Sequence, residues 1–576
     1  MHQFSVVGGS SLLNSSSPDQ ISATRSKPPI DFAGGRIFPL PLLVVMATAF
    51  LVILPFFFLG NPSGHDFEFH VNSWMEVLGQ WRQGIIYPRW AALAQYGYGE
   101  ARFIFYPPIS WTLGASLGVF LPWRVVPGAY IWLALTLSGC SMFLLARRWL
   151  GYRDAIFAAA LYAANPYYIV IVYWRSAFAE LLAGALLPLL LLSALRLEQD
   201  EAEPALPLVL IVTAAWLTNI PAAIILNYSL VLLILILAIL RRSPKLLLRG
   251  GLAVLLGAAL AAFFLVPAAY EQKWVNIAEA LSPGVRPQDN FLFKNISDID
   301  HNRFNLFVSV IATAEMIVLV IAAFFSRPWR RQQPQAWWTL FGWALVSTLL
   351  NFSFTVWLWD YLPELRYLQL PWRWLLCLNL TFALFVTMAS RRWLVRALIC
   401  LSMLAVIIFV GHRVQTPWWE KAEDLTQMLN AQRSGAGYEG TDEYVPVGGD
   451  PYEIKQDAPW VTLNDTLLPS VQSSRIQIQQ WDAESRSFTA DLAQPGQLVL
   501  RLFNYPAWHV EVNARAVTTA TRAVTGQMLI PLQAGHNLLR ITFSRTWDRT
   551  VGAIISATTA LFLGAFVLFI RPKHRR

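Results

Sequence analysis

Apolar residues along this chain fall in long runs, which short polar segments separate. Because about 20 helical residues at 1.5 Å rise cross the hydrocarbon of a bilayer, each run predicts a membrane helix. Successive membrane helices must cross in alternating directions. Residues 106–122 do not fit this alternation as a crossing, so they are expected to form a re-entrant or interfacial element. About twelve crossings result, at 38–59, 124–146, 154–173, 179–195, 205–219, 221–240, 251–269, 305–325, 336–356, 373–390, 393–411 and 550–570.

The side of the membrane on which each loop lies is predicted from its Lys and Arg residues, because cytoplasmic loops carry these residues in excess. Clusters occur at 25–36, 147–148, 196, 241–245, 327–331, 391–392 and 571–576. With these clusters inside, the loops rich in His, Asp, Arg and aromatic residues face outward. We therefore expect the functional site on the non-cytoplasmic face.

Between 412 and 548 the pattern changes to alternating apolar and polar residues with Gly and Pro turns, which is typical of strands. The predicted fold is a mainly α polytopic membrane helix bundle with a small extracytoplasmic β-sandwich-like domain before the last membrane helix. The predicted divisions are a disordered cytoplasmic tail (1–36), a membrane domain (37–411) with a large first outer loop (60–123), the β-rich domain (412–548) and the final helix with a basic tail (549–576).

Composition agrees with a membrane protein, since 56% of residues are hydrophobic and 14% are charged. The net charge of +9 reflects the clusters between apolar runs, so no nucleic-acid partner is expected. The three cysteines lie inside apolar runs and predict neither a disulfide framework nor a zinc site.

The first outer loop contains the sequence Gly64-His65-Asp66 followed by an apolar stripe that predicts an interfacial helix over 66–83. Asp66 and His70 lie one helical turn apart. Asp66 is a favoured N-cap residue, but it is also a candidate catalytic base or metal ligand, with His70 or His65 beside it and His70 as the candidate second metal ligand. A divalent metal ion is the one cofactor that this pattern allows.

Ionisable residues also occur at the outer ends of the later runs. Glu180 begins one run, where a helix N-terminus favours a negative charge, and it is the second catalytic candidate. Arg175 and Arg373 lie on the side where Arg is disfavoured. Snorkelling explains them in part, but the planar guanidinium also suits phosphate. Two first-loop arginines, Arg89 and Arg102, are weaker phosphate candidates, together with Tyr106.

No GxGxxG sequence follows a predicted strand, and no P-loop occurs in the sequence. A site on the outer face without cytoplasmic nucleotides requires an activated donor that is already in the membrane, such as a polyprenyl phosphate carrying a sugar.

The chain resembles the GT-C superfamily of membrane glycosyltransferases, and within it a bacterial branch described as 6-pyruvoyl-tetrahydropterin synthase-related membrane proteins. The matching stretches lie at 64–70, 87–90, 105–108, 175–180, 369–373, 440–446, 504–508 and 534–536. The resemblance implies a catalytic or metal-binding role for Asp66 and a second acidic role for Glu180. A pterin activity is not implied, because that soluble enzyme uses a histidine-rich zinc site and the His residues here are scattered.

The leading hypothesis is therefore a glycosyltransferase of the bacterial inner membrane. It would move a sugar from a polyprenyl-phosphate donor to an envelope glycan, lipid or protein outside the cytoplasm, surrounded by membrane lipid. A lipid-linked saccharide transporter or flippase and a non-catalytic envelope assembly factor remain as alternatives. A transporter would carry ionisable residues midway through its helices.

Overall fold

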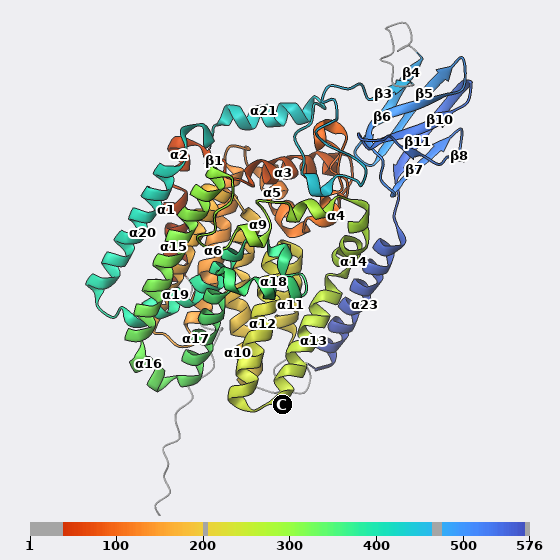
Figure 1. The fold of residues 1–576 in the computed structure, drawn as a ribbon. Coiled ribbons are helices and arrows are strands. Elements are labelled where there is room, and N and C mark those ends of the chain that lie inside the picture. The colour runs from red at the N-terminus through yellow and green to blue at the C-terminus, as the bar shows by residue number, and fades with distance from the viewer. Residues whose placement is uncertain (1–38, 200–204, 464–474, 571–576) are drawn as a thin grey trace, which may run out of the picture. The chain divides into compact units, whose positions relative to one another are not determined.

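The computed structural model describes residues 39–199, 205–463 and 475–570. The predicted disordered tail (1–36) and the basic clusters at 25–36 and 571–576 lie outside these residues. Residues Pro41–Arg576 pack as one unit, and the description below concerns that unit (Figure 1).

Within the described residues, nine helices are long and apolar enough to cross a membrane. Two further pairs, bent by 76° and 93°, are also apolar enough, and α11 is a shorter apolar helix. All predicted crossings coincide with these elements, whereas α5 (Pro108–Phe120) is not among them. The nine are α1–α2 (Pro39–Leu59), α6 (Val126–Ala146), α7–η2 (Tyr152–Arg175), α9–α10 (Phe178–Glu198), α12 (Ile220–Arg241), α15 (Ile299–Phe325), η8–α19 (Pro371–Ala389), α20 (Trp393–Arg413) and α23 (Trp547–Leu568). The bent pairs are α13 (Pro244–Leu260) with α14 and η3 (Ala262–Trp274), and α17 (Pro334–Leu349) with η6 and α18 (Ser353–Tyr361); α11 is Leu206–Thr218.

Among the described residues, the basic clusters gather at one end of the helix bundle. The ring of Trp149 contacts that of Trp329 at 5.9 Å, which places the 147–148 cluster beside α16 (Arg327–Gln332). An ion pair joins Arg241 to Glu198. A second, of 2.7 Å, joins Arg396 to Asp154. In Figure 1, α16 and the α12–α13 turn lie at the lower end, while α3, α21 and the β-sheets lie at the upper end. The described clusters therefore lie at one end of the bundle, as the predicted alternation requires, and the assignment of that end to the cytoplasm stays a prediction.

Two sheets form the C-terminal β-sandwich and share one apolar core. Its strands begin at Val461, not at 412, because the residues before them form α21 (Ala422–Arg433) and loops. The sandwich core also takes in Trp90 and Tyr98 of the first outer loop, so the two regions pack together. One sheet has the order β3 (Val461–Leu463), β6 (Gly496–Phe503), β10 (Gln527–Leu532), β9 (Ala520–Thr521); the other has the order β4 (Ile476–Trp481), β5 (Ser485–Leu492), β11 (Gly535–Phe543), β7 (Trp508–Val512), β8 (Arg515–Ala516).

The helix predicted over 66–83 is α3 (Phe67–Arg82). Its polar side is buried as well as its apolar stripe, since Asn72, Glu76 and Gln80 are all at most 4% exposed. The helix is therefore covered by protein on its polar side too, and its expected interfacial position stays a prediction. The polar face packs beneath α21 and the loop after it, and Gln432 donates to the side-chain oxygen of Asn72 at 2.9 Å.

A short antiparallel ribbon joins the first outer loop to the chain after α20. It consists of β1 (Asn61–Pro62) and β2 (Trp419–Glu420). This ribbon holds residues 63–66 next to the outer ends of the membrane helices.

Candidate functional site

The His65-Asp66 loop lies directly against the outer end of η2 (Ile171–Arg175). The backbone N–H of Asp66 donates to the carbonyl of Arg175 at 2.8 Å. Gly64 makes this approach possible, because a Cβ at this position would lie 2.5 Å from the carbonyl oxygen of Trp174. The chain reverses at Ser176, which has a left-handed conformation (φ 51°). The local backbone therefore brings Asp66 and Arg175 to one place.

Glu180 is the centre of the charged cluster. It lies in the first turn of α9 (Phe178–Gly184) and is buried. Its Oε2 accepts from Arg175 Nη1 at 2.7 Å and from Arg373 Nε at 3.1 Å. Its Oε1 accepts from the hydroxyl of Tyr167 at 2.5 Å. The ring of Trp372 lies 4.8 Å from the Arg175 guanidinium. One carboxylate thus holds two arginines that are 4% and 7% exposed.

Asp66 adds a second carboxylate to the cluster. Its Oδ2 lies 3.9 Å from Arg175 Nη2, and its Oδ1 lies 2.7 Å from Nδ1 of the exposed His65. The side chain makes no capping hydrogen bond to α3, so the N-cap interpretation does not explain Asp66.

The pKa values of the two neighbours move in opposite directions. Burial would raise the pKa of Asp66, but the hydrogen bond from His65 and the charges of His65 and Arg175 outweigh it and hold this pKa below its usual range. The hydrogen bond and charge of Asp66 raise the pKa of His65. Asp66 is therefore ionised at neutral pH and poorly suited to take a proton in the ground state.

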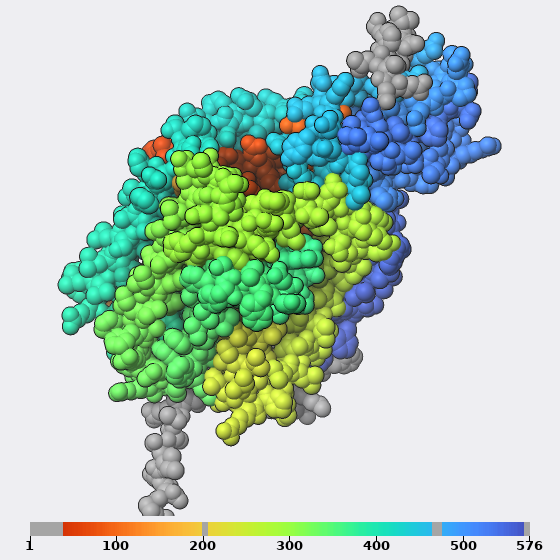
Figure 2. All heavy atoms as spheres, in the orientation of Figure 1, coloured from red at the N-terminus to blue at the C-terminus, as the bar shows by residue number. Residues whose placement is uncertain are grey.

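A cavity of about 1080 Å³ opens over this cluster and is lined by Asp66, Arg175 and Arg373 together. In Figure 2 the red atoms of the first outer loop lie recessed between the cyan chain around α21 and the yellow-green chain below. One wall is aromatic, since the rings of Phe304 and Phe307 lie 6.1 Å and 5.0 Å from the ring of Trp174. The cavity therefore combines a charged floor with an apolar wall, as a ligand with an anionic group and a hydrocarbon or sugar part requires.

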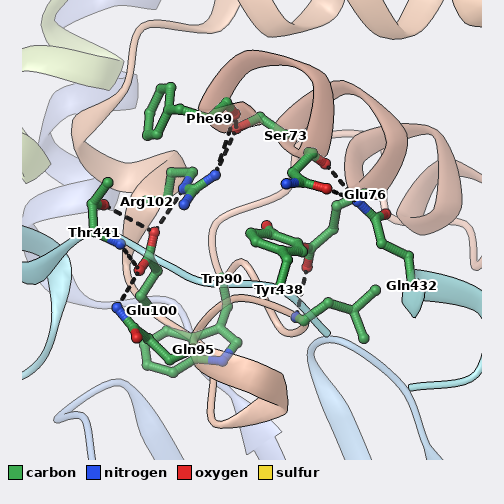
Figure 3. A network of polar contacts seen from close by, with 12 residues as sticks. Phe69, Ser73, Glu76, Trp90, Gln95, Glu100, Arg102, Gln432, Tyr438 and Thr441 are labelled. Carbon is green, nitrogen blue, oxygen red and sulfur yellow. Dashed lines mark hydrogen bonds and ion pairs between the residues drawn. The ribbon is translucent and has the colours of Figure 1, made fainter. Parts of the chain in front are cut away.

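Arg102 lies elsewhere, in a buried polar network behind α3 (Figure 3). Its Nε donates to Glu100 at 2.6 Å and its Nη1 donates to Ser73 at 2.9 Å. The side chain is 1% exposed and does not line the cavity. This placement does not support the expected phosphate role of Arg102, because its guanidinium neutralises a buried carboxylate.

Arg89 and Tyr106 are also absent from the cavity lining. The guanidinium of Arg89 lies 5.5 Å from the ring of Tyr87, and its backbone N–H donates to Glu484 of the sandwich. Tyr106 packs edge-on against Phe69, with 4.7 Å between the ring centroids. Neither placement supports direct contact with a phosphate in this cavity.

His70 is buried behind Asp66 and has an unpaired Nδ1. Burial, opposed by the charge of Asp66, lowers its pKa to about 4, so it is neutral. In the described part of the chain no group of three or more His, Cys, Asp or Glu side chains is arranged to hold a metal ion. Asp66 and His70 could supply two ligands at most, so we derive no step through a metal.

Sequence reasoning missed several residues of the site and its surroundings. Tyr167 and Trp372 stand in outward loops that are conspicuous in the sequence, but nothing there indicates their contact with the Glu180 cluster. Glu315 was also missed. It lies inside α15, 3% exposed, and both carboxyl oxygens lack a hydrogen-bond partner among the described residues. A single Glu within an apolar run would have marked it.

No curated protein matches this chain. Two solved structures are similar, both with a TM-score of 0.37 over 70% of this chain. They are the oligosaccharyltransferase of Archaeoglobus fulgidus in complex with zinc and sulfate (12% identity) and the archaeal oligosaccharyltransferase AglB from the same organism with an inhibitory peptide and a dolichol-phosphate (11% identity). The chain spans 54% and 56% of those two chains.

The family comparison covers more of the sequence. Residues 103–416, more than half of the chain, match the membrane protein family described as the 6-pyruvoyl-tetrahydropterin synthase related domain. The matched segment runs from the first outer loop through α20 and so includes Arg175, Glu180 and Arg373. The chain belongs to this family of membrane proteins.

Proposed function

We propose that this protein is a glycosyltransferase that uses a polyprenyl-phosphate-linked sugar as donor and works on the non-cytoplasmic face of the bacterial inner membrane. The observation that carries the proposal is the shared cavity, in which Asp66, Arg175 and Arg373 surround one space at the outer ends of the helices. The acceptor would be an envelope glycan, lipid or protein.

The donor phosphate fits the arginine side of the cavity. Arg373 uses Nε for Glu180 and Nη1 for the carbonyl of Leu368 at 2.6 Å, which leaves Nη2 for a ligand. Arg175 is held rigid by Glu180 and faces the same space. Fixed guanidinium groups would stabilise the negative charge that grows on the phosphate as the bond from the sugar C1 to the phosphate oxygen breaks.

The acceptor fits the Asp66 side. An acceptor hydroxyl would attack the sugar C1 and lose its proton, while the electron pair of the broken bond goes to the leaving phosphate. Ionised Asp66 would accept a hydrogen bond from that hydroxyl and orient it. As the oxygen becomes acidic in the transition state, Asp66 would receive the proton.

The test is transfer of a radiolabelled sugar from synthetic polyprenyl phosphates in proteoliposomes. Asp66→Asn should lose at least 100-fold in rate, within the range of about 10²–10⁴ that general base catalysis contributes, and should still insert. The matched control is Asp300→Asn, which removes an exposed carboxylate from the lining of the same cavity. Equal rates for wild type and Asp66→Asn would refute the catalytic assignment.

Glu315 supports a second candidate function, a lipid-linked saccharide transporter. Ionisable residues buried in a membrane helix often mark transport pathways, and Glu315 is such a residue. Glu315→Gln should abolish flipping of a fluorescent lipid-linked saccharide if this function is the correct one. If the protein is a transferase, Glu315→Gln should keep transfer and Asp66→Asn should not.

A further inference from the structure

A second cavity, of about 660 Å³, lies beside the first and is not part of the site described above. The β1–β2 ribbon separates the two. Gly60, Asn61 and residues 420–422 line the second cavity, whereas residues 63–66 and 412–416 line the first. We call the second cavity the ribbon groove, defined by its lining at 50–61, 124–132 and 420–422.

The body of the ribbon groove is apolar and open to the outside of the helix bundle. Phe50, Phe57 and Phe58 form part of its wall, and they are 44%, 63% and 81% exposed. In a helix that crosses the membrane, such exposed side chains face lipid. Gly128 leaves space at its floor, where a Cβ would meet Phe56 at an ordinary 3.6 Å.

The outer end of the ribbon groove has a net positive charge, since two cations, Arg124 and Lys421, line it together with one carboxylate, Glu420. Arg124 and Lys421 both line it and are exposed. Neither has a carboxylate within ion-pair distance among the described residues. Lys421 is the N-cap residue of α21, whose first turn carries Glu423 and Asp424 to complement the helix dipole. Arg124 lies at the outer end of α6, on the side where Arg is rare. An anionic group in the groove would balance the excess positive charge of Arg124 and Lys421 over Glu420.

The length of the groove indicates which lipid fits. From Phe50 to Leu59 the chain rises about 14 Å at 1.5 Å per residue, which is close to half of the roughly 30 Å hydrocarbon thickness. A chain confined to one leaflet therefore fits, as the acyl chain of a phospholipid does. A polyprenyl chain is much longer than one leaflet.

We propose that the ribbon groove binds an anionic phospholipid, with its phosphate between Arg124 and Lys421 and an acyl chain along Phe50–Leu59. The site is independent of the proposed transferase activity, since it lies on the far face of the ribbon from Asp66.

The experiment uses the full-length protein in nanodiscs that contain phosphatidylcholine with 20% phosphatidylglycerol, the latter carrying a photoreactive group on one acyl chain. This fraction is of about the magnitude of the anionic lipid content of membranes. Crosslinked peptides are then mapped by mass spectrometry. Labelling should concentrate on the peptides that contain 50–59 and 125–132. Photoreactive phosphatidylcholine at the same level should label these peptides at least threefold less.

Two variants separate charge from shape. The double variant R124Q/K421Q removes the basic end, and Gly128→Leu fills the floor without changing charge. Each should reduce labelling of the two peptides at least fivefold. The control K294Q/R366Q removes two exposed cations outside the groove and should leave labelling unchanged.

Folding is checked by size-exclusion chromatography and thermal unfolding, and Gly128→Leu keeps the test valid if the double variant does not fold. Equal labelling by the two phospholipids, or unchanged labelling in Gly128→Leu, would overturn the proposal. Displacement of the phospholipid by an equimolar polyprenyl phosphate would also overturn it, because the occupant would then be of another class.

Discussion

Arg373 Nε lies 3.1 Å from Glu180 Oε2, although the two residues are 193 positions apart in the chain. This contact joins the outer start of α19 to the outer start of α9. Because Arg175 donates to the same carboxylate oxygen, both arginines are held in fixed positions before any ligand arrives. Fixed donors lose little conformational entropy on binding, which favours recognition of a phosphate.

Glu180→Gln should destabilise the protein. The variant leaves two buried guanidinium groups without their shared carboxylate, and loss of one partner of a buried ion pair costs about 3–5 kcal/mol. Thermal unfolding in detergent should show a clear fall in Tm. The control Glu279→Gln changes an exposed carboxylate and should leave Tm unchanged. A Glu180→Gln protein as stable as wild type would contradict the central role of this carboxylate.

Arg373→Lys should weaken donor binding while keeping the charge. Lysine cannot contact Glu180, the Leu368 carbonyl and a ligand at once, because it lacks the planar fork. We expect about a tenfold rise in Kd for a non-hydrolysable polyprenyl phosphosugar, which corresponds to about 1.4 kcal/mol. Arg366→Lys, at an exposed position, is the control. Equal affinities in the two variants would exclude Arg373 from the phosphate site.

Donor binding should depend on pH through His65. The unfolded pKa of a histidine is about 6.5, and Asp66 raises the pKa of His65 in the folded protein. Protonated His65 therefore stabilises the folded protein fully at a pH below the pKa of His65 in the unfolded chain. This stabilisation is lost as the pH rises through the raised pKa of His65 in the folded protein.

The donor itself is a phosphodiester and does not titrate in this range. Affinity measured from pH 5.5 to 9 should fall in wild type as His65 loses its proton. In His65→Gln this fall should be absent. Identical profiles would show that His65 does not contribute charge to the site.

Gly64→Ala should disturb the site without touching a charged residue. The new Cβ would lie 2.5 Å from the Trp174 carbonyl, so the loop must move away from Arg175. We expect transfer activity to fall at least tenfold with little change in expression. Gly79→Ala, where a Cβ meets nothing within 4 Å, is the matched control. Full activity in Gly64→Ala would show that the loop position is not critical.

Arg102→Met should reduce stability and not donor affinity. It leaves Glu100 buried without its 2.6 Å partner, and the expected cost is about 3–5 kcal/mol. Arg82→Met, at an exposed position at the end of α3, is the control. Weaker donor binding in a stable Arg102→Met protein would show that Arg102 contributes to phosphate binding.

The helices, and the gathering of the described basic clusters at one end of the bundle, could be predicted from the sequence, because long apolar runs and basic clusters are local signals. The grouping of Asp66, Arg175 and Arg373 also followed, since alternation placed all three at one end. The role of Glu180 as a bridge did not follow, because it depends on how α9 packs against α19. The burial of the polar side of α3 did not follow for a similar reason: its partners Gln432 and Tyr438 come much later in the chain.

The polar network of Figure 3 joins segments of the chain that are synthesised at different times. Gln432 and Asn72, which it joins, are 360 positions apart. At a synthesis rate of about 5–20 residues per second, roughly 20–70 s pass between them. During that time Arg102 and Gln95 are already beside Glu100, but Tyr438 and Thr441, which complete the hydrogen bonds of Glu76 and Glu100, have not been made. Nascent chains that stall or end before α21 therefore carry two carboxylates whose hydrogen bonds are incomplete, which distinguishes them from finished protein.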